Sequence, residues 1–165
     1  MPELSGVLGP FFELFLHYMS GGYWHHTNIY VGDGKIIESL PPKVREVNYE
    51  IIHTATDVAV YRVKTTDEIK RKAVKFCKDK VGTLFSFRYA YIFPILYPSV
   101  SHVEGDRYYC SELVWAAYKS AGIDINGYPG FISPPISGYA VAPQSIADSD
   151  NVELITSAGK RKVGC

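Results

Sequence analysis

The chain of 165 residues lacks several features that mark whole classes of protein. Its 17 Lys and Arg balance 17 Asp and Glu, so no excess of positive charge is present to bind a nucleic-acid backbone. Three cysteines cannot all pair within one chain, and a domain of this size does not need disulfides, which indicates reduced thiols. The apolar run over residues 7–19 is interrupted by Glu13 and His17 and is too short to span a bilayer. We therefore expect no nucleic-acid partner and no transmembrane segment.

The N-terminus also lacks the basic residues and the small-residue cleavage site of a signal peptide, so a cytoplasmic location is expected. The composition, 47% hydrophobic without a linker or repeat, predicts a single domain over residues 1–165. Aromatic residues make up 14% and include 13 tyrosines. They are dense over residues 85–97, where they either pack the core or form an apolar wall for a substrate.

The order of predicted elements favours an α+β fold. Residues 11–19 suit a helix, and residues 28–31 and 35–38 a hairpin. A strand is expected over 58–63, and a helix from a capping box at Thr65 and Glu68 to about Val81, with Cys77 on its inner face. A further helix begins near Cys110, a loop covers 127–143, and a last strand lies near 152–155. This order predicts a mostly antiparallel sheet or small barrel packed against helices.

Cys110 is the first candidate for chemistry. A thiolate at a helix N-terminus faces unsatisfied amides and the positive end of the helix dipole, which favours the nucleophilic form. The alternative is a small apolar residue at the start of a buried helix.

His26 and Glu38 flank the predicted hairpin and form the second candidate. If residues 32–34 make a three-residue loop with Gly34 left-handed, Asn28 lies opposite Glu38, and His26 and Glu38 share one face. If Asp33 and Gly34 make a two-residue turn, the register shifts by one and the two side chains point to opposite faces.

Two segments carry a resemblance to a known family. His26-Thr-Asn-Ile-Tyr-Val-Gly-Asp-Gly-Lys-Ile-Ile-Glu38, followed far downstream by Tyr109-Cys-Ser-Glu-Leu-Val-Trp115, resembles the circularly permuted branch of the NlpC-type papain-like cysteine peptidases, the YiiX/YebB-like group. The resemblance implies a permuted papain-like fold in which Cys110 is the nucleophile, His26 the base and Glu38 the residue that orients the imidazole. Phe85 stands where the family tends to have a tyrosine, so Tyr109, or else Tyr89, becomes the candidate for an oxyanion or auxiliary role.

The resemblance implies a cysteine hydrolase that cleaves an amide through an acyl-enzyme. The substrate would be a small peptide, a cell-wall peptide or a lipid-linked amide. One alternative is a thiol acyltransferase or lipase similar to the lecithin retinol acyltransferase group, and another is a catalytically silent binding module of the same fold. No cofactor is expected, and no metal, because the histidines and cysteines show no ligand spacing typical of zinc. The sequence gives no oligomeric state.

Overall fold

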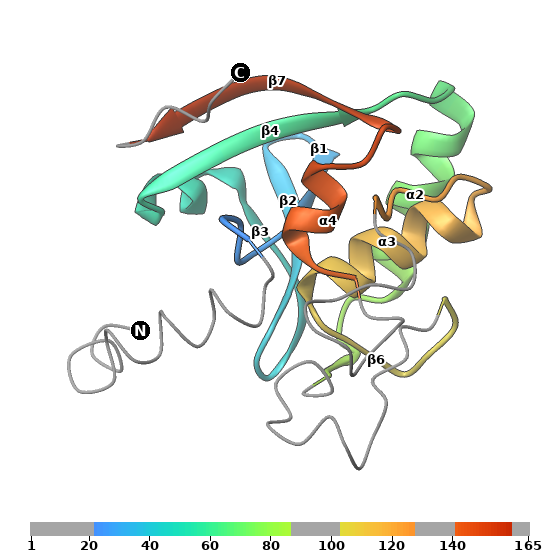
Figure 1. Cartoon of the computed structure of the whole chain (residues 1–165). Coiled ribbons are helices and arrows are strands. Elements are labelled where there is room, and N and C mark those ends of the chain that lie inside the picture. Colours follow the sequence, from blue (N-terminus) through green and yellow to red (C-terminus); the bar gives the residue numbers. More distant parts are fainter. Residues whose placement is uncertain (1–21, 87–102, 128–140, 160–165) are drawn as a thin grey trace, which may run out of the picture.

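The computed structural model describes residues 22–86, 103–127 and 141–159 of the chain. These residues form an α+β structure in which the longer helices lie to one side of a curved sheet and a two-stranded ribbon runs along the top of the view (Figure 1). The predicted helix over 11–19, the loop residues 128–140 and Cys165 lie outside the described residues, as do most of the aromatic stretch and Tyr89.

The hairpin of β1 (Asn28–Gly32) and β2 (Lys35–Leu40) has the predicted register, but for a different reason. Asp33 and Gly34 form a two-residue turn, both at positive φ (52° and 70°). Such a turn alone would have shifted the register. A β-bulge between Tyr30 and Gly32 inserts one extra residue and restores it, so that Asn28 pairs with Glu38.

The larger sheet has the strand order β1-β2-β3-β5-β6. Strand β3 (Lys43–Asn48), which the sequence analysis did not predict, pairs antiparallel with β2 along its whole length and places Arg45 opposite Glu38. Two short strands, β5 (Leu84–Phe85) and β6 (Arg107–Tyr108), extend the sheet and pair in parallel. Strand β6 is thus one edge of the sheet and β1 of the hairpin is the other edge. Cys110 lies two residues after the end of β6 in the chain.

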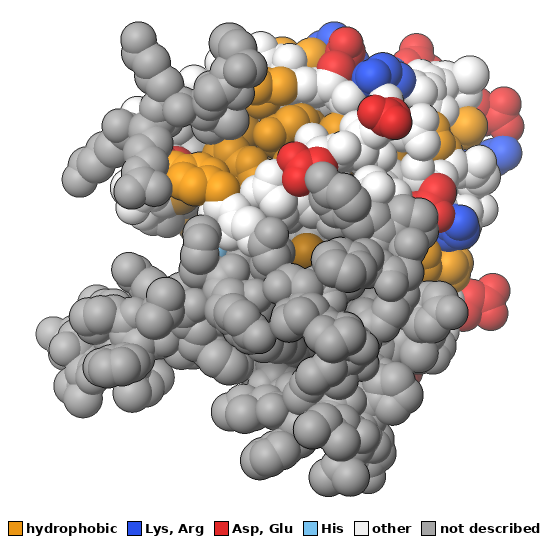
Figure 2. All heavy atoms as spheres, viewed as in Figure 1, with side chains coloured by type: hydrophobic (Ala, Val, Ile, Leu, Met, Phe, Trp, Pro, Cys, Tyr) orange, Lys and Arg blue, Asp and Glu red, His pale blue; other side chains and the backbone are white. Residues whose placement is uncertain are grey.

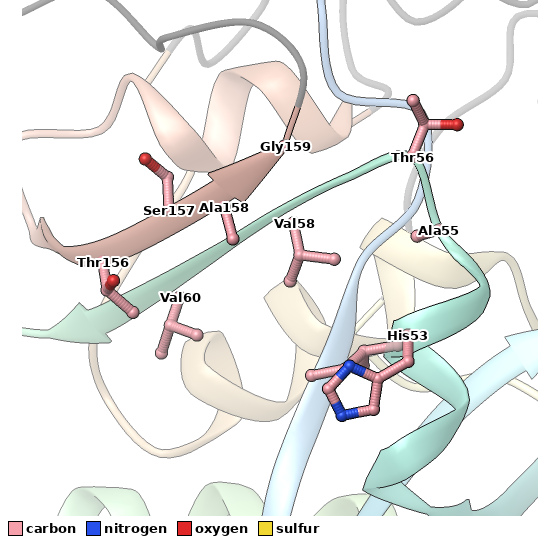
Figure 3. A pocket seen from close by; sticks show the side chains of 10 residues that line it. His53, Ala55, Thr56, Val58, Val60, Thr156, Ser157, Ala158 and Gly159 are labelled. Carbon is pink, nitrogen blue, oxygen red and sulfur yellow. The ribbon is translucent and has the colours of Figure 1, made fainter.

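Strand β4 (Asp57–Val63) and strand β7 (Val152–Gly159) form a separate antiparallel ribbon, preceded by the short 3-10 helix η1 (Tyr49–Thr54). Figure 2 shows hydrophobic side chains exposed on the part of the molecule where this ribbon lies, and Val60, Leu154 and Ile155 are each more than two-fifths exposed. A shallow cavity of about 290 Å³ lies between the ribbon and η1 (Figure 3). Its lining includes His53, Val58 and Ala158, and none of the predicted site residues.

Helices α2 (Asp67–Asp79) and α3 (Cys110–Ser120) pack against each other and against the hairpin. The predicted inner face of α2 is confirmed, with Ala73 and Cys77 fully buried. Its predicted cap is wrong by one residue, because Thr66 rather than Thr65 is the N-cap and its hydroxyl accepts from the amide of Ile69 (3.3 Å).

The core gathers between the two helices, the hairpin and the start of β7. It contains these buried residues: Ile29, Val31, Ile37, Val44, Val63, Ala73, Cys77, Tyr108, Leu113, Val114, Ala117, Ile125, Val141, Ile146 and Val152. A last short helix, α4 (Pro143–Ala147), begins where the sequence analysis expected a loop to end. Pro143 in the first turn of α4 is a helix-start signal that the prediction did not use.

Candidate active site

Cys110 is the first residue of α3, as predicted, and it is partly exposed. Tyr109, the residue before it, has an extended backbone (φ −92°, ψ 173°), so the chain changes from extended to helical directly at Cys110. The carboxylate of Glu112 accepts from the backbone N–H of Tyr109 (3.4 Å), which satisfies an amide at this helix end. The thiol therefore lies where the first amides of the helix create a positive potential.

His26 and Glu38 are in contact, as the register required. The Nε2 atom of His26 lies 2.8 Å from the Oε2 atom of Glu38. Glu38 is almost completely buried (3% exposed), whereas the side chain of His26 is about a third exposed (34%). The imidazole also hydrogen-bonds to Cys110, so one histidine joins the thiol of α3 to the acid of β2. Since Nε2 faces the carboxylate, Nδ1 is the ring nitrogen left for the thiol.

Electrostatics in this trio favour a charged thiol and a charged imidazole. Burial raises the pKa of the Cys110 thiol, but the hydrogen bond and charge of His26, with the backbone amides of Thr27 and Ser111, lower it below its usual value overall. Burial lowers the pKa of His26, and contacts with Cys110 and Glu38 outweigh this and raise it to about 9. The hydrogen bond from His26 is the largest cause that lowers the pKa of Glu38. Both shifts favour an ion pair of thiolate and imidazolium over the neutral thiol and imidazole.

Arg45 is a fourth member of the cluster, and the sequence analysis missed it. Its Nη2 and Nε atoms donate to the Oε1 atom of Glu38 at 2.7 and 3.0 Å. The only local signal for it is weak: Pro41 and Pro42 suggest a turn after β2, and the β-branched residues Val44 and Val47 fit a third strand, whose pairing then places residue 45 opposite 38.

Buried hydroxyl groups fix the backbone on both sides of the cysteine. Ser39 of β2 donates to the carbonyl of Tyr108 (2.6 Å), and Ser111 donates to the carbonyl of Val141 (2.7 Å). The hydroxyl of Tyr109 accepts from the amide of Val141 (2.9 Å), and the Tyr109 side chain is buried. The Tyr109 hydroxyl therefore binds the backbone at Val141. Its predicted role at an oxyanion stays a prediction.

Gln144 of α4 holds the segment that leads to His26. Its Oε1 atom accepts from the amides of Tyr23 (2.9 Å) and Trp24 (3.3 Å) across more than a hundred residues of sequence. No pattern in the sequence could have identified this contact.

Cys77 behaves as predicted for a structural thiol. It is fully buried in the face of α2 that meets the core, and burial raises its pKa to about 12. Among the described residues, no group of three or more His, Cys, Asp and Glu side chains converges in a way that could hold a metal ion. In the same part of the chain, no helix is long and apolar enough to cross a membrane.

A helix that begins at a cysteine, packed on a sheet with a histidine just before its first strand and an acid on its second, both earlier in the chain than the cysteine, defines the permuted class of papain-like folds. The chain belongs to the permuted papain-like amidases of the YaeF/YiiX, C92 family, whose family model matches residues 7–156. The predicted family, the α+β papain-like fold and the assignment as a cysteine peptidase or amidase are thereby confirmed.

A solved structure supports the fold. The crystal structure of the metalloprotein yiiX from Escherichia coli O157:H7 (DUF1105) superposes with a TM-score of 0.56, at 19% sequence identity and over 76% of each chain. At this identity the likeness concerns the fold alone. No curated protein matches the chain.

Proposed function

We propose that this amidase cleaves its substrate through a Cys110–His26–Glu38 triad and a thioester intermediate. The observation that carries the proposal is the position of the His26 imidazole, which hydrogen-bonds to the thiol of Cys110 and lies 2.8 Å from the buried carboxylate of Glu38. A nucleophile, a base and a group that orients the base then stand in hydrogen-bonded sequence.

In the proposed reaction the Sγ atom of Cys110 attacks the carbonyl carbon of an amide. The carbonyl oxygen gains the negative charge, and the backbone amide of Cys110 at the start of α3 is the proposed donor to it. The C–N bond then breaks as the imidazolium of His26 gives its proton to the departing amine. Water, deprotonated by the neutral imidazole, attacks the thioester, releases the carboxylic acid and restores the thiol.

The related E. coli structure is described as that of a metalloprotein, so the fit of a metal to these residues matters. Both oxygens of Glu38 already have partners, Oε2 on His26 and Oε1 on Arg45. Glu38 is thus engaged with the base and with Arg45, and because no three His, Cys, Asp or Glu side chains of the described residues converge as ligands, the triad does not fit a metal site. The proposed steps accordingly use only the chain's own side chains.

The test is to trap the acyl-enzyme. The protein is incubated at mildly acidic pH with a panel of amides, namely short peptides, a cell-wall peptide and a long-chain N-acyl amide, and intact mass spectrometry follows covalent adducts. We expect an adduct that maps to Cys110, is absent from Cys110→Ser, and decays in water to the free acid. Turnover that survives Cys110→Ala would refute the thioester mechanism.

The same experiment distinguishes hydrolysis from acyl transfer. If adding an amine or alcohol acceptor diverts the trapped acyl group quantitatively while water alone releases none, the protein is an acyltransferase and the proposed hydrolysis is wrong. The chain length of the acyl group in the best substrate then reports whether the site takes peptide or lipid-like amides.

A further inference from the structure

The carboxylate of Glu38 is held by two residues, one on each oxygen. Oε2 faces Nε2 of His26 at 2.8 Å, and Oε1 accepts from both Nη2 (2.7 Å) and Nε (3.0 Å) of Arg45. Arg45 lies directly opposite Glu38 in the pairing of β2 and β3, so its side chain reaches the carboxylate from the neighbouring strand.

We propose that Arg45 is a positioning residue for the triad, which locks the carboxylate of Glu38 in the orientation and the charge state that hold His26 against Cys110. This inference rests on the proposed function and adds to it a fourth residue. It predicts that Arg45 acts on the thiol only through Glu38.

The contact geometry explains why a second partner is needed. A carboxylate can rotate about its last bond, and one hydrogen bond to a partly exposed imidazole leaves that rotation open. Two N–H groups of the same guanidinium donate to Oε1 and hold this oxygen in place, and a carboxylate with one oxygen held cannot rotate freely about that bond. The orientation of Oε2 toward His26 follows from the anchoring of Oε1.

Burial gives Arg45 a second effect. Glu38 is 3% exposed, so water cannot solvate its charge, and burial by itself raises the pKa of the carboxyl. Arg45 and His26 together lower that pKa below its usual value. Among the described residues, the charged groups that face the carboxylate are His26, from the segment before β1, and Arg45 from β3. Helix α3 contributes Cys110, which contacts the imidazole instead.

Arg62 provides a matched control. It lies opposite Glu153 across β4 and β7, as Arg45 lies opposite Glu38, but its nearest contact is 3.5 Å and both side chains are exposed. Arg62→Met therefore removes the same charge from an equivalent cross-strand pair away from the triad.

The experiment measures the rate of iodoacetamide alkylation of Cys110 between pH 4 and 9, with the labelled cysteine identified by peptide mass spectrometry. The variants are Arg45→Met, Arg45→Lys, Glu38→Gln, the double variant of Arg45→Met with Glu38→Gln, and Arg62→Met. Thermal melting of each variant shows that it is folded.

We expect Arg45→Met to move the acid limb of the profile upward by on the order of half a pH unit, and Glu38→Gln to move it further in the same direction. The double variant should match Glu38→Gln, because Arg45 has no route to the thiol once the carboxylate is gone. Arg45→Lys should recover part of the shift, and Arg62→Met should keep the wild-type profile.

Each contrary result has one meaning. A wild-type profile in Arg45→Met, with Glu38→Gln shifted, overturns the role of Arg45 and leaves the triad intact. Shifts that simply add in the double variant overturn action through Glu38 and show instead a direct charge effect. If Cys110 of the unmodified protein is not alkylated at acidic pH at all, the proposed function fails and this inference fails with it.

Discussion

Replacing His26 by alanine tests the ion pair most directly, because it should change Cys110 reactivity in opposite directions at low and high pH. The substitution removes both the hydrogen bond and the positive charge that lower the pKa of the thiol, and leaves burial, which raises it, opposed only by the amides of Thr27 and Ser111. The pKa of Cys110 must therefore rise.

The magnitude follows from two competing effects. Below both pKa values, each unit of increase in the thiol pKa reduces the thiolate fraction about tenfold. Each unit also makes the remaining thiolate about threefold more nucleophilic, since the Brønsted coefficient of thiolates is about 0.4–0.5. The net loss of alkylation rate at acidic pH is then about three- to fourfold per unit, while above both pKa values the variant should react faster than the unmodified protein.

The assay follows iodoacetamide labelling of Cys110 from pH 4 to 10 by mass spectrometry, with buried Cys77 as an internal control that should stay unlabelled. The two pH–rate curves should cross. If the curve for His26→Ala lies below that of the unmodified protein at every pH, the histidine acts on access or folding rather than on the thiol pKa. If the curves coincide, there is no ion pair.

Further predictions concern the acid, the core and the anchoring contacts. Because the folded-state pKa of Glu38 lies below its ordinary 4.5, its contribution to stability is present above about pH 4.5 and is lost as the pH falls further; melting temperatures between pH 3 and 6 should decline less steeply for Glu38→Gln, and parallel declines would contradict this. Leu113→Ala, at a position with no exposed surface, should cost about 2–5 kcal/mol in urea unfolding while the alkylation profile of the folded protein keeps its shape. Gln144→Leu removes the acceptor for the amides before His26; it should slow acidic alkylation of Cys110 several-fold, and an unchanged rate would show that this anchor is dispensable.

The hairpin shows how a sequence can predict a contact without predicting its cause. The turn residues and the two strands were visible in the sequence, and so was the consequence that His26 and Glu38 share a face only in one register. The structure reaches that register through a two-residue turn and a bulge at Tyr30–Gly32. Gly32, where the bulge ends, has a φ of 95° that favours glycine, but Gly-Asp-Gly fits a three-residue loop as well as a two-residue turn after a bulge, so the sequence does not choose between them.

The contacts of the site that the sequence analysis missed depend on strand pairing or on residues far apart in the sequence. Arg45 needed β3, a strand with only two apolar residues, Val44 and Val47, whose partner is known only once the strand is placed. The anchoring bonds from Ser111 and Gln144 join α3 and α4 to backbone groups far along the chain. Backbone acceptors and donors are present at every residue, so a sequence holds no mark of which one a side chain will choose.

The helices could be predicted because both have local causes that outweigh distant ones. In α2 the apolar stripe and its cap, and in α3 the small and aliphatic residues before Gly122, specify the buried faces from within one segment. The error of one residue at the cap of α2 has the same origin, since Thr65 and Thr66 both carry a suitable hydroxyl and only the path from β4 decides between them.

The reversed order of the site residues along the chain follows from the same physics. The thiol needs a helix N-terminus, and the imidazole must lie beside the carboxylate on one face of the hairpin; neither requirement refers to which segment comes first. In this chain Glu38 and Arg45 lie on the neighbouring strands β2 and β3, His26 lies two residues before β1, and Ser39 of β2 connects this unit to α3 by donating to the carbonyl two residues before the cysteine. Ser39 and Glu38 are adjacent on β2, so a single strand fixes both the nucleophile's backbone and the acid that orients its base. A shift of β2 by one residue would therefore disturb both ends of the triad together, which makes the hairpin register the structural feature on which the proposed chemistry most depends.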